Sequence, residues 1–440
     1  MYYKIINKYI YMLIKNRILL ISAALAMIAS CNTGINDPIA IEFPTPTESI
    51  TKVMLSETEQ GYVNSGNDMS LKLFVKLYDG SNLVCSPLSI QFALAMTANG
   101  ASGETLSETT DFLGYGKDGI AALNAYCNSL LKQLPAVDLD VKLKLVDALI
   151  VNSDFPLLAS FKETVEKSYY AAVDNRSFNS PSEVAALIND WTKRSTEGFI
   201  DKVLFADDIS KDAVAFIMNA LYFKAKWAGS EHDPMFREER TKEEDFTLTD
   251  GSKVRIPMMN NSSYHKYAEM DGFKVLALPY ASRKYYMYIL LPEKNDLAGL
   301  VKKLPDITWK DILSNLKQDA RVNVKLPRFD IENKFNLNEP LKSLGVRKIF
   351  SSGKADFSNM FADKIKQYWI DKVFQKARIS VAEWGTEAAA VTVVAVDGAT
   401  SAGPGDEPKR VNFYADHPFL FLIGESTSGT ILFIGAYTGE

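Results

Sequence analysis

The segment between Gly385 and Arg410 most constrains the fold, because it joins a strand-like half to a loop-like half. In an extended conformation its alternate residues would form one small, uncharged face that suits the middle of a sheet: Thr386, Ala388, Ala390, Thr392, Val394 and Val396. From residue 397 onward the segment is rich in Gly and Pro, charged and without a period. Since a strand usually ends in a tight turn, this order indicates a strand-competent segment that is tethered as a loop. An ordinary strand is the alternative.

Residues 51–440 are expected to form one domain of the α+β class. Helical spacing dominates the first part, as in SPLSIQFALAMTANGA and EVAALINDWTKRSTEGFI. From about residue 215 onward, β-branched and aromatic runs closed by Gly, Pro or Asp predict strands, as in FKVLALPY and YYMYILLPEK. No repeat or linker divides this region, and 47% apolar residues supply a large core. Helices that come largely first and strands that come largely later predict the α+β class.

Residues 1–30 have the pattern of an export signal. The basic stretch MYYKIINKYIYMLIKNR precedes an apolar run that is too short and wrongly flanked for a membrane span. The run ends in IASC, which resembles a bacterial lipobox. Cys31 is therefore predicted to carry the lipid of a bacterial lipoprotein, exported and membrane-anchored, that faces the periplasm or the cell exterior. Residues 31–50 would be the lipidated Cys and an extended tether, and a plain secretory signal with a chance Cys is the alternative.

Charge and cysteine content narrow the choice of partners. The formal net charge is −5, and it becomes about −9 without residues 1–31, which carry four basic residues and no acidic ones. An acidic domain of this kind is not expected to bind nucleic acid, and the only predicted membrane contact is the lipid. Cys85 and Cys127 could pair in an exported chain, but the apolar run around Cys85 favours a small buried hydrophobe.

Catalytic motifs are weak or missing in the sequence. The GxGxxG pattern at residues 114–119 follows a polar helical segment, whereas a dinucleotide site needs a strand before it. No GxSxG nucleophile motif occurs. The three histidines lack the spacing of a metal site: His232, His265 and His417. We therefore expect no enzyme activity, no cofactor and no metal.

Several motifs, in order along the chain, resemble the serpin family. The stretch GTEAAAVT at residues 385–392 closely resembles the hinge of inhibitory serpins. Further stretches are similar to other motifs of that family: NLVCSPLSIQFALAMTANGASGETLSE, NALYFKAKW, LPRFDIENKFNLNEPLKSLGVRKIF, and FYADHPFLFLI with GTILFIGAY. The resemblance covers about residues 51–440. It implies the serpin fold, with three β-sheets, eight or nine helices and an exposed reactive-centre loop at about residues 383–412.

The resemblance also implies a function. It predicts an irreversible suicide-substrate inhibitor of serine proteases, elastase-like or subtilisin-like, with some cysteine proteases as further targets. The target would cleave the loop, be trapped as a covalent acyl-enzyme and be displaced as the hinge inserts into a sheet, serpin loop insertion being an established example of strand addition. A non-inhibitory serpin that acts as a binding or structural protein is the alternative. The expected state is a monomer, with loop-sheet polymers as a second state.

The resemblance finally assigns roles to individual residues. The scissile bond is placed between Ala399 and Thr400, or within three residues of it, and the small Ala399 favours proteases with shallow specificity pockets. The hinge comprises eight residues: Gly385, Thr386, Glu387, Ala388, Ala389, Ala390, Val391 and Thr392. Two sets are expected to control sheet opening: Ser86, Ser89, Asn219 and Gln375 beneath the sheet centre, and Trp227, Arg328 and Glu383 where insertion begins. Gln375 replaces the His that is common at its position, but an amide can still donate and accept.

Overall fold

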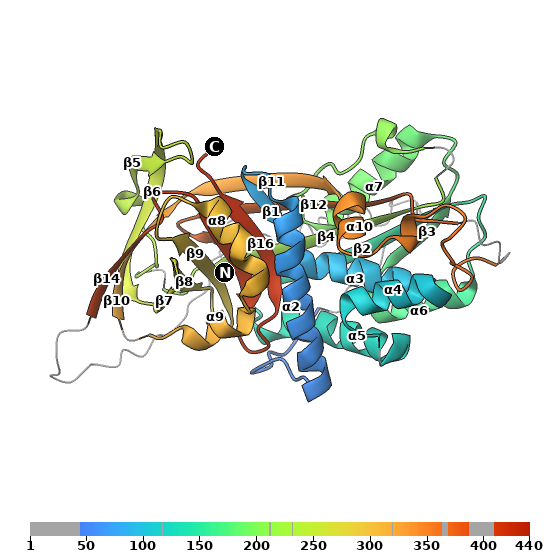
Figure 1. The fold of residues 1–440 in the computed structure, drawn as a ribbon, viewed down its shortest axis with the longest axis horizontal. Helices are drawn as coiled ribbons and strands as arrows, with labels where there is room; N and C mark the ends of the chain where they lie inside the picture. The colour runs from blue at the N-terminus through green and yellow to red at the C-terminus, as the bar shows by residue number, and fades with distance from the viewer. Residues whose placement is uncertain are drawn as a thin grey trace, which may run out of the picture. The chain divides into compact units, whose positions relative to one another are not determined.

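The computed structural model, drawn in Figure 1, describes residues 45–440 except for these positions: 117, 211–212, 231, 319, 363–367 and 387–408. The predicted signal with Cys31, the hinge from Glu387 to Thr392 and the Ala399–Thr400 bond therefore lie outside the described residues. Within the described part of the chain there are nine α-helices and three β-sheets, which confirms the predicted α+β class. None of these helices is long and apolar enough to cross a bilayer. No cluster of His, Cys, Asp or Glu in the same residues could hold a metal ion.

Six of the nine helices precede residue 200, in the region where helical spacing predicted them. α2 begins with a capping box between Ser56 and Glu59. α3 begins at Pro87, whose fixed φ suits the first helical position, and all twelve of its residues are buried. The bounds are α2 (Glu57–Leu77), α3 (Pro87–Ala98), α4 (Gly103–Leu113), α5 (Gly119–Val137), α6 (Ala159–Tyr169), α7 (Pro181–Ser195), α8 (Leu297–Lys303), α9 (Trp309–Asn315) and α10 (Asn338–Ser343).

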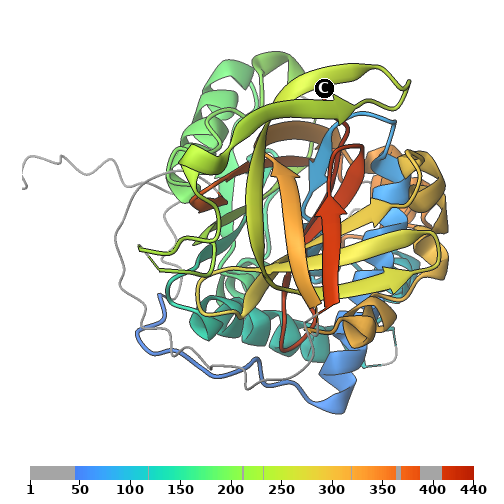
Figure 2. The same ribbon diagram turned by 90° about the vertical axis from the view of Figure 1, so that its left-hand side faces the viewer.

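The three sheets have separate strand orders. The main sheet has the order β11 (Phe329–Asn336), β12 (Lys372–Ala382), β13 (Gly385–Thr386), β4 (Ala215–Lys226), β2 (Lys142–Asn152) and β3 (Ala172–Arg176). The second sheet has the order β1 (Leu83–Cys85), β16 (Ile431–Tyr437), β15 (Phe419–Glu425), β9 (Tyr285–Pro292), β8 (Phe273–Pro279) and β7 (Lys266–Met270). The third has the order β14 (Lys409–Tyr414), β10 (Ala320–Pro327), β6 (Lys253–Tyr264) and β5 (Lys242–Thr247), and Figure 2 shows β14 beside β10.

Three strands, β1 to β3, come before residue 215, although the sequence pattern placed the strands largely after it. β2 was not recognised as a strand because its last eight residues are all buried, which removes the polar and apolar alternation. β1 pairs with β16, so that Leu83 lies opposite Ala436 near the end of the chain. Cys85 in β1 and Cys127 in α5 are both buried and unpaired, as the apolar surroundings of Cys85 indicated.

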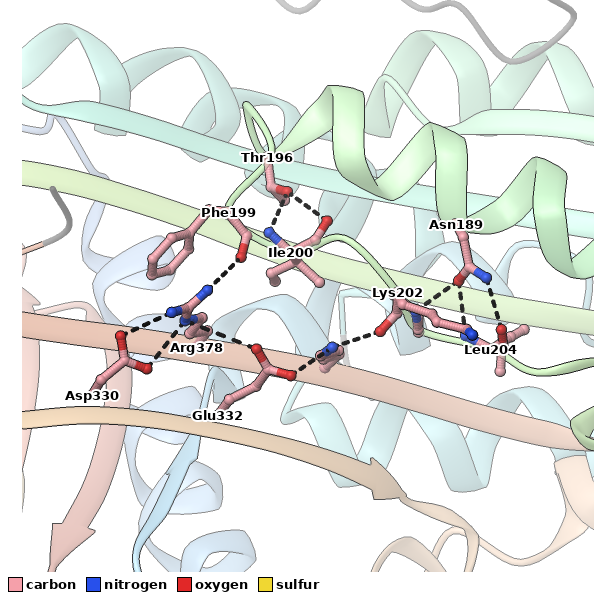
Figure 3. Close-up of polar contacts among 11 residues, drawn as sticks. Asn189, Thr196, Phe199, Ile200, Lys202, Leu204, Asp330, Glu332 and Arg378 are labelled. Carbon is pink, nitrogen blue, oxygen red and sulfur yellow. Dashed lines mark hydrogen bonds and ion pairs between the residues drawn. The ribbon is translucent and has the colours of Figure 1, made fainter. Parts of the chain in front are cut away.

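The two faces of the main sheet have different neighbours. On β4 and β12 the odd-numbered apolar residues, such as Ile217 and Val373, belong to the large core that also contains the side chains of α3. Even-numbered residues of β12 point to the opposite face, where the connection between α7 and β4 runs alongside this strand (Figure 3). A side chain on β4 or β12 therefore reaches either the core or this connection, according to its number.

Candidate functional site

Gly385 and Thr386 form a two-residue strand inside the main sheet. β13 pairs antiparallel with β12 on one side and with β4 on the other. Gly385 has a φ of +148°, and a Cβ on it would lie 2.1 Å from the carbonyl oxygen of Ala225. No residue with a side chain fits this backbone without displacement. The first hinge residue is therefore a glycine because β4 approaches it so closely.

Thr386 fixes the hinge through its side chain. The residue is 2% exposed, and its hydroxyl lies 2.5 Å from the hydroxyl of Tyr280. The ring of Tyr280 stacks on Trp227, with the centroids 4.5 Å apart and the planes 8° from parallel. Burial raises the pKa of Tyr280 well above its ordinary value, so its hydroxyl stays protonated. Thr386, Tyr280 and Trp227 are thus linked in a continuous row, by a hydrogen bond and then by ring stacking, next to β13.

An ion pair between a buried acid and a half-exposed arginine lies next to the hinge. Arg328 donates to both carboxylate oxygens of Glu383, at 2.6 and 3.1 Å, and Thr241 donates to the same carboxylate. Burial raises the pKa of Glu383, but these hydrogen bonds outweigh burial and hold the pKa below its usual value. Trp227 donates its indole N–H to the carbonyl of Ala382, at 2.8 Å. The structure thus brings Trp227, Arg328 and Glu383 together where β13 begins.

Three of the four residues expected under the sheet centre form one cluster. The amide of Gln375 on β12 donates to the carbonyl of Ser86 and to the hydroxyl of Ser89, both at 2.8 Å, and accepts from the backbone N–H of Ser86 at 3.0 Å. The hydroxyl of Ser86 donates to the carbonyl of Leu432 on β16. Gln375 therefore uses both ends of its amide to hold β12 against the start of α3, as its hydrogen-bonding capacity allows.

The fourth residue, Asn219, takes a different partner. It lies opposite Gln375 in the parallel pairing of β12 with β4, and opposite Asp147 in the antiparallel pairing of β4 with β2. Its side-chain amide donates to the carboxyl of Asp147 at 2.6 Å. Burial raises the pKa of Asp147 to about 7, and the bond from Asn219 offsets only part of that rise. Asp147, Asn219 and Gln375 therefore form a polar row across three strands of an apolar sheet.

Gly385 and Thr386 already lie as a strand between β4 and β12, whereas the sequence motifs implied a loop that stays exposed until it is cleaved. Residues 64–439 match the family model described as Serpin (serine protease inhibitor). The chain belongs to the serpin family. This serpin is 36% identical to Serpin-Z7 of Hordeum vulgare over 369 residues, which cover 81% of this chain and 89% of that protein. It is 34% identical to Serpin-ZXA of Oryza sativa subsp. japonica over 370 residues, with the same coverage.

Solved serpin structures share the fold. A thermophilic serpin, Tengpin, in the native state superposes with a TM-score of 0.76 and 29% identity, over 91% of this chain and 99% of that one. Arabidopsis AtSerpin1 in its native stressed conformation superposes with a TM-score of 0.75 and 29% identity, over 87% and 99% of the two chains. The predicted serpin fold with three sheets is therefore confirmed. Serpins are protease inhibitors rather than enzymes, which agrees with the expectation of a non-enzyme.

The connection after α7 is fastened to β12 in this serpin (Figure 3). Lys376 donates to the carbonyl of Lys202 at 2.6 Å, and Arg378 donates to the carbonyl of Phe199 at 3.3 Å. Both cations also bind acidic residues of β11: Lys376 pairs with Glu332 at 2.6 Å, and Arg378 holds both oxygens of Asp330 at 3.0 and 3.1 Å. We call Lys376 and Arg378 the connection clamp. They tie β12 to a segment that lies over the sheet.

The sequence analysis missed Tyr280, Asp147 and the connection clamp. Asp147 carried one signal, because it is the only acidic residue in the apolar run KLKLVDALIVN. Tyr280 directly follows the strand-like run that ends at Pro279, where it resembled an ordinary strand end. The carbonyl partners of the clamp left no signal, since any residue provides a main-chain carbonyl, and its acidic partners lie on another strand. The roles assigned to the sheet-opening residues stay predictions.

Proposed function

We propose that this serpin is an irreversible inhibitor of serine proteases that acts by loop cleavage, acyl-enzyme trapping and strand insertion. The observation that carries the proposal is the position of β13. Gly385 and Thr386 already occupy the first two positions of a strand between β12 and β4. Insertion of the following residues would therefore continue a pairing that has begun, without any new register search.

The register of β13 determines which rows further residues would fill. Thr386 lies opposite Ala225 on β4 and Val381 on β12. Because both pairings are antiparallel, each step forward along the loop corresponds to one step back on both strands. Residues 220–224 and 376–380, all of them described, have no strand pairing with each other. These five rows have the length that the next five residues of the loop would need.

On insertion, the same register would bring one hinge residue to the polar row. β4 and β12 pair directly only from Asn219 and Gln375 onward, toward Phe216 and Lys372. Counting back from Thr386 brings Thr392 to the row of Asn219 and Gln375, on the same side of the new strand as Thr386. Insertion beyond Val391 would therefore have to separate β4 from β12, and the polar row is the first pair that would part.

Insertion would release a large free energy. About a dozen new backbone hydrogen bonds at roughly 0.5–1.5 kcal/mol each, with burial of the Ala, Val and Thr face, amount to an order of ten or more kcal/mol. The uncleaved form would then be kinetically trapped rather than the most stable state.

The composition of the inward face favours an inhibitor over the alternative of a non-inhibitory serpin. Residues 386–396 contain no proline, and their alternate inward positions are Thr, Ala and Val only. A bulky or charged inward residue would stop insertion and leave a binding or structural protein. Ala399 before the proposed bond favours elastase-like or subtilisin-like proteases as targets, because a shallow pocket accepts a small side chain.

The test mixes the purified protein with an elastase-like, a subtilisin-like and a trypsin-like protease. We expect a complex that survives boiling in detergent with at least one of the first two, because the acyl bond is covalent. Mass spectrometry of the released C-terminal peptide would then locate the cleaved bond, which we place at Ala399–Thr400. Cleavage without a stable complex across the whole panel would contradict inhibition and favour the non-inhibitory alternative.

Export and lipid attachment are a separate proposal, and it rests on the sequence of residues 1–31. The mature protein would be held at the membrane by lipid on Cys31 and would face the periplasm or the cell exterior. Growth of an expressing bacterium with a clickable fatty acid would label the wild-type protein and would leave Cys31→Ser unlabelled. Equal labelling of both proteins would contradict the assignment of Cys31.

A further inference from the structure

Asp147 is a buried acid in the polar row of the main sheet. It is 1% exposed and lies on the side of β2 that faces the core, between the apolar residues Leu145 and Leu149. Its one hydrogen bond in the described part of the chain comes from Asn219. A carboxylate buried among apolar side chains usually has several donors, because an ionised group loses its hydration there. Asp147 is therefore poorly suited to carry a charge in this conformation.

Two oxygen atoms of this pair lack donors. Neither Asp147 Oδ2 nor Asn219 Oδ1 has a hydrogen-bond partner among the described residues, and both atoms are buried. A proton on Asp147 would turn its free oxygen into a donor and its carboxyl into a neutral group. A carboxylic acid and a primary amide that meet edge to edge can form two hydrogen bonds. Protonation therefore supplies the donor that the pair lacks, whereas ionisation leaves two buried acceptors without one.

The other titratable groups that face Asp147 stay neutral near pH 7. Cys127 of α5 and Tyr169 at the end of α6 interact electrostatically with Asp147, and burial raises the pKa of each side chain above its ordinary value. The hydroxyl of Tyr169 donates to Asn124. α3, which packs below β2 and β4, has no titratable side chain. Asp147 is therefore the group in this cluster whose charge changes around neutral pH.

We propose that Asp147 is a positioning residue for strand insertion, which acts through Asn219 and makes insertion faster when its carboxyl is ionised. The inference rests on the insertion step of the proposed function. With a protonated Asp147, the amide of Asn219 is satisfied at both ends and remains held against β2. With an ionised Asp147, Asn219 Oδ1 has no donor until the incoming strand brings a hydroxyl to this row. Insertion then gains a hydrogen bond that the closed sheet lacks.

The test uses a fluorescent synthetic peptide with the sequence of residues 386–398 as the incoming strand, so that no protease is needed. Both ends of the peptide are blocked, so its only ionisable groups are two side-chain carboxyls, which titrate well below pH 6. We expect incorporation into the wild-type protein to be about fivefold faster at pH 8 than at pH 6. This factor corresponds to the free energy of one hydrogen bond to a buried acceptor that otherwise has no donor. Asp147→Asn, which cannot ionise, should show equal rates at the two pH values.

A matched control is Glu425→Gln. Glu425 is also 1% exposed, but it accepts from the N–H groups of Thr427 and Ser428 and from the hydroxyl of Ser428, so its substitution should leave the pH ratio unchanged. The same pH ratio in Asp147→Asn as in wild type would overturn the proposal. If the peptide inserts with the expected ratio while no protease forms a stable complex, the proposed inhibition fails and the role of Asp147 stands.

An infrared titration of the wild-type protein decides the matter if Asp147→Asn does not fold. A carbonyl band of a buried, protonated carboxylic acid should be present at pH 6 and should disappear by pH 8. Absence of such a band at pH 6 would show that Asp147 is already ionised, which would overturn the proposal without any variant.

Discussion

Arg328 holds Glu383 through two hydrogen bonds, although the two residues differ in their contact with solvent. The side chain of Glu383 is 5% exposed and that of Arg328 is 46% exposed. The arginine thus covers the acid from the outer side, at the point where the chain leaves β12 and turns into the hinge. Because the carboxylate of Glu383 is buried, loss of Arg328 would leave it as an unpaired charge and would destabilise the native form.

Arg328→Met should therefore destabilise the native form by about 1–3 kcal/mol, because the buried carboxylate loses two charged donors. The pKa of Glu383 is lowered in the native state, so the stability that the pair contributes is present above the ordinary value of 4.5 and is lost as the pH falls below it. The difference in urea midpoint between wild type and variant should shrink below about pH 4. Arg255→Met is the control, since Arg255 binds the exposed Asp245; an equal loss in both variants would contradict the prediction.

Under the proposed insertion mechanism, Thr386→Arg should turn an inhibitor into a substrate. The substitution would place an unpaired charge beside Tyr280, at a position that is 2% exposed, and burial of such a charge costs several kcal/mol. We expect the detergent-stable complex to fall at least about tenfold while the loop is still cleaved. Glu387→Arg is the control, because alternation puts residue 387 on the outer face of the new strand. Unchanged complex formation by Thr386→Arg would argue against insertion.

Gly385→Ala should loosen the hinge from the sheet. Its Cβ would clash with the carbonyl of Ala225 at a φ of +148°, so we expect a loss of about 2 kcal/mol or more. The urea midpoint and the rate of proteolytic cleavage after Glu383 measure the effect. Gly61→Ala in α2, where nothing lies within 4 Å of a Cβ, is the control and should be neutral or stabilising. A neutral result for Gly385→Ala would contradict the close approach of β4.

Removal of the connection clamp should free the segment over the sheet. In the double variant Lys376→Met and Arg378→Met, the carbonyls of Lys202 and Phe199 lose their donors. Amide hydrogen exchange in residues 196–204 should become faster, and the native form should lose about 1–3 kcal/mol. Lys342→Met, which breaks an exposed pair with Glu339, should change stability by less than about 0.5 kcal/mol. Unchanged exchange in the double variant would show that the clamp does not hold the connection.

The sequence predicted the parts of the fold that depend on local pattern or on a recognised motif. Helices such as α3 and α7, the class and the family followed from spacing and from motifs such as GTEAAAVT, whereas α6 was not predicted. The pairing of β1 with β16 could not be predicted from pattern, because strand partners far apart in sequence leave no periodic trace. The ion pair of Arg328 with Glu383 was anticipated as a set of residues, whereas its two-bond geometry depends on burial that only the fold provides.

The polar row shows most clearly what could not be anticipated. Asn219 was expected to join Ser86, Ser89 and Gln375 in one network, but its side chain turns to Asp147 instead. Gln375 already satisfies its amide on α3, so it has no donor left for Asn219. Asn219 thus bonds to Asp147 because the donors of Gln375 are already used. Which donors are used depends on the three-dimensional arrangement and not on residue type.

The pairing of β1 with β16 has a consequence for biosynthesis. β16 lies between the edge strand β1 and β15, so β1 cannot join the second sheet until residues 431–437 have been made. Contacts of such long range form slowly, because a large loop must close before any of them contributes. A nascent copy therefore cannot complete its fold while the C-terminal residues are still inside the ribosome. On the proposed export route, this delay would leave the chain unfolded while it crosses the membrane, until its last strand pairs with β1.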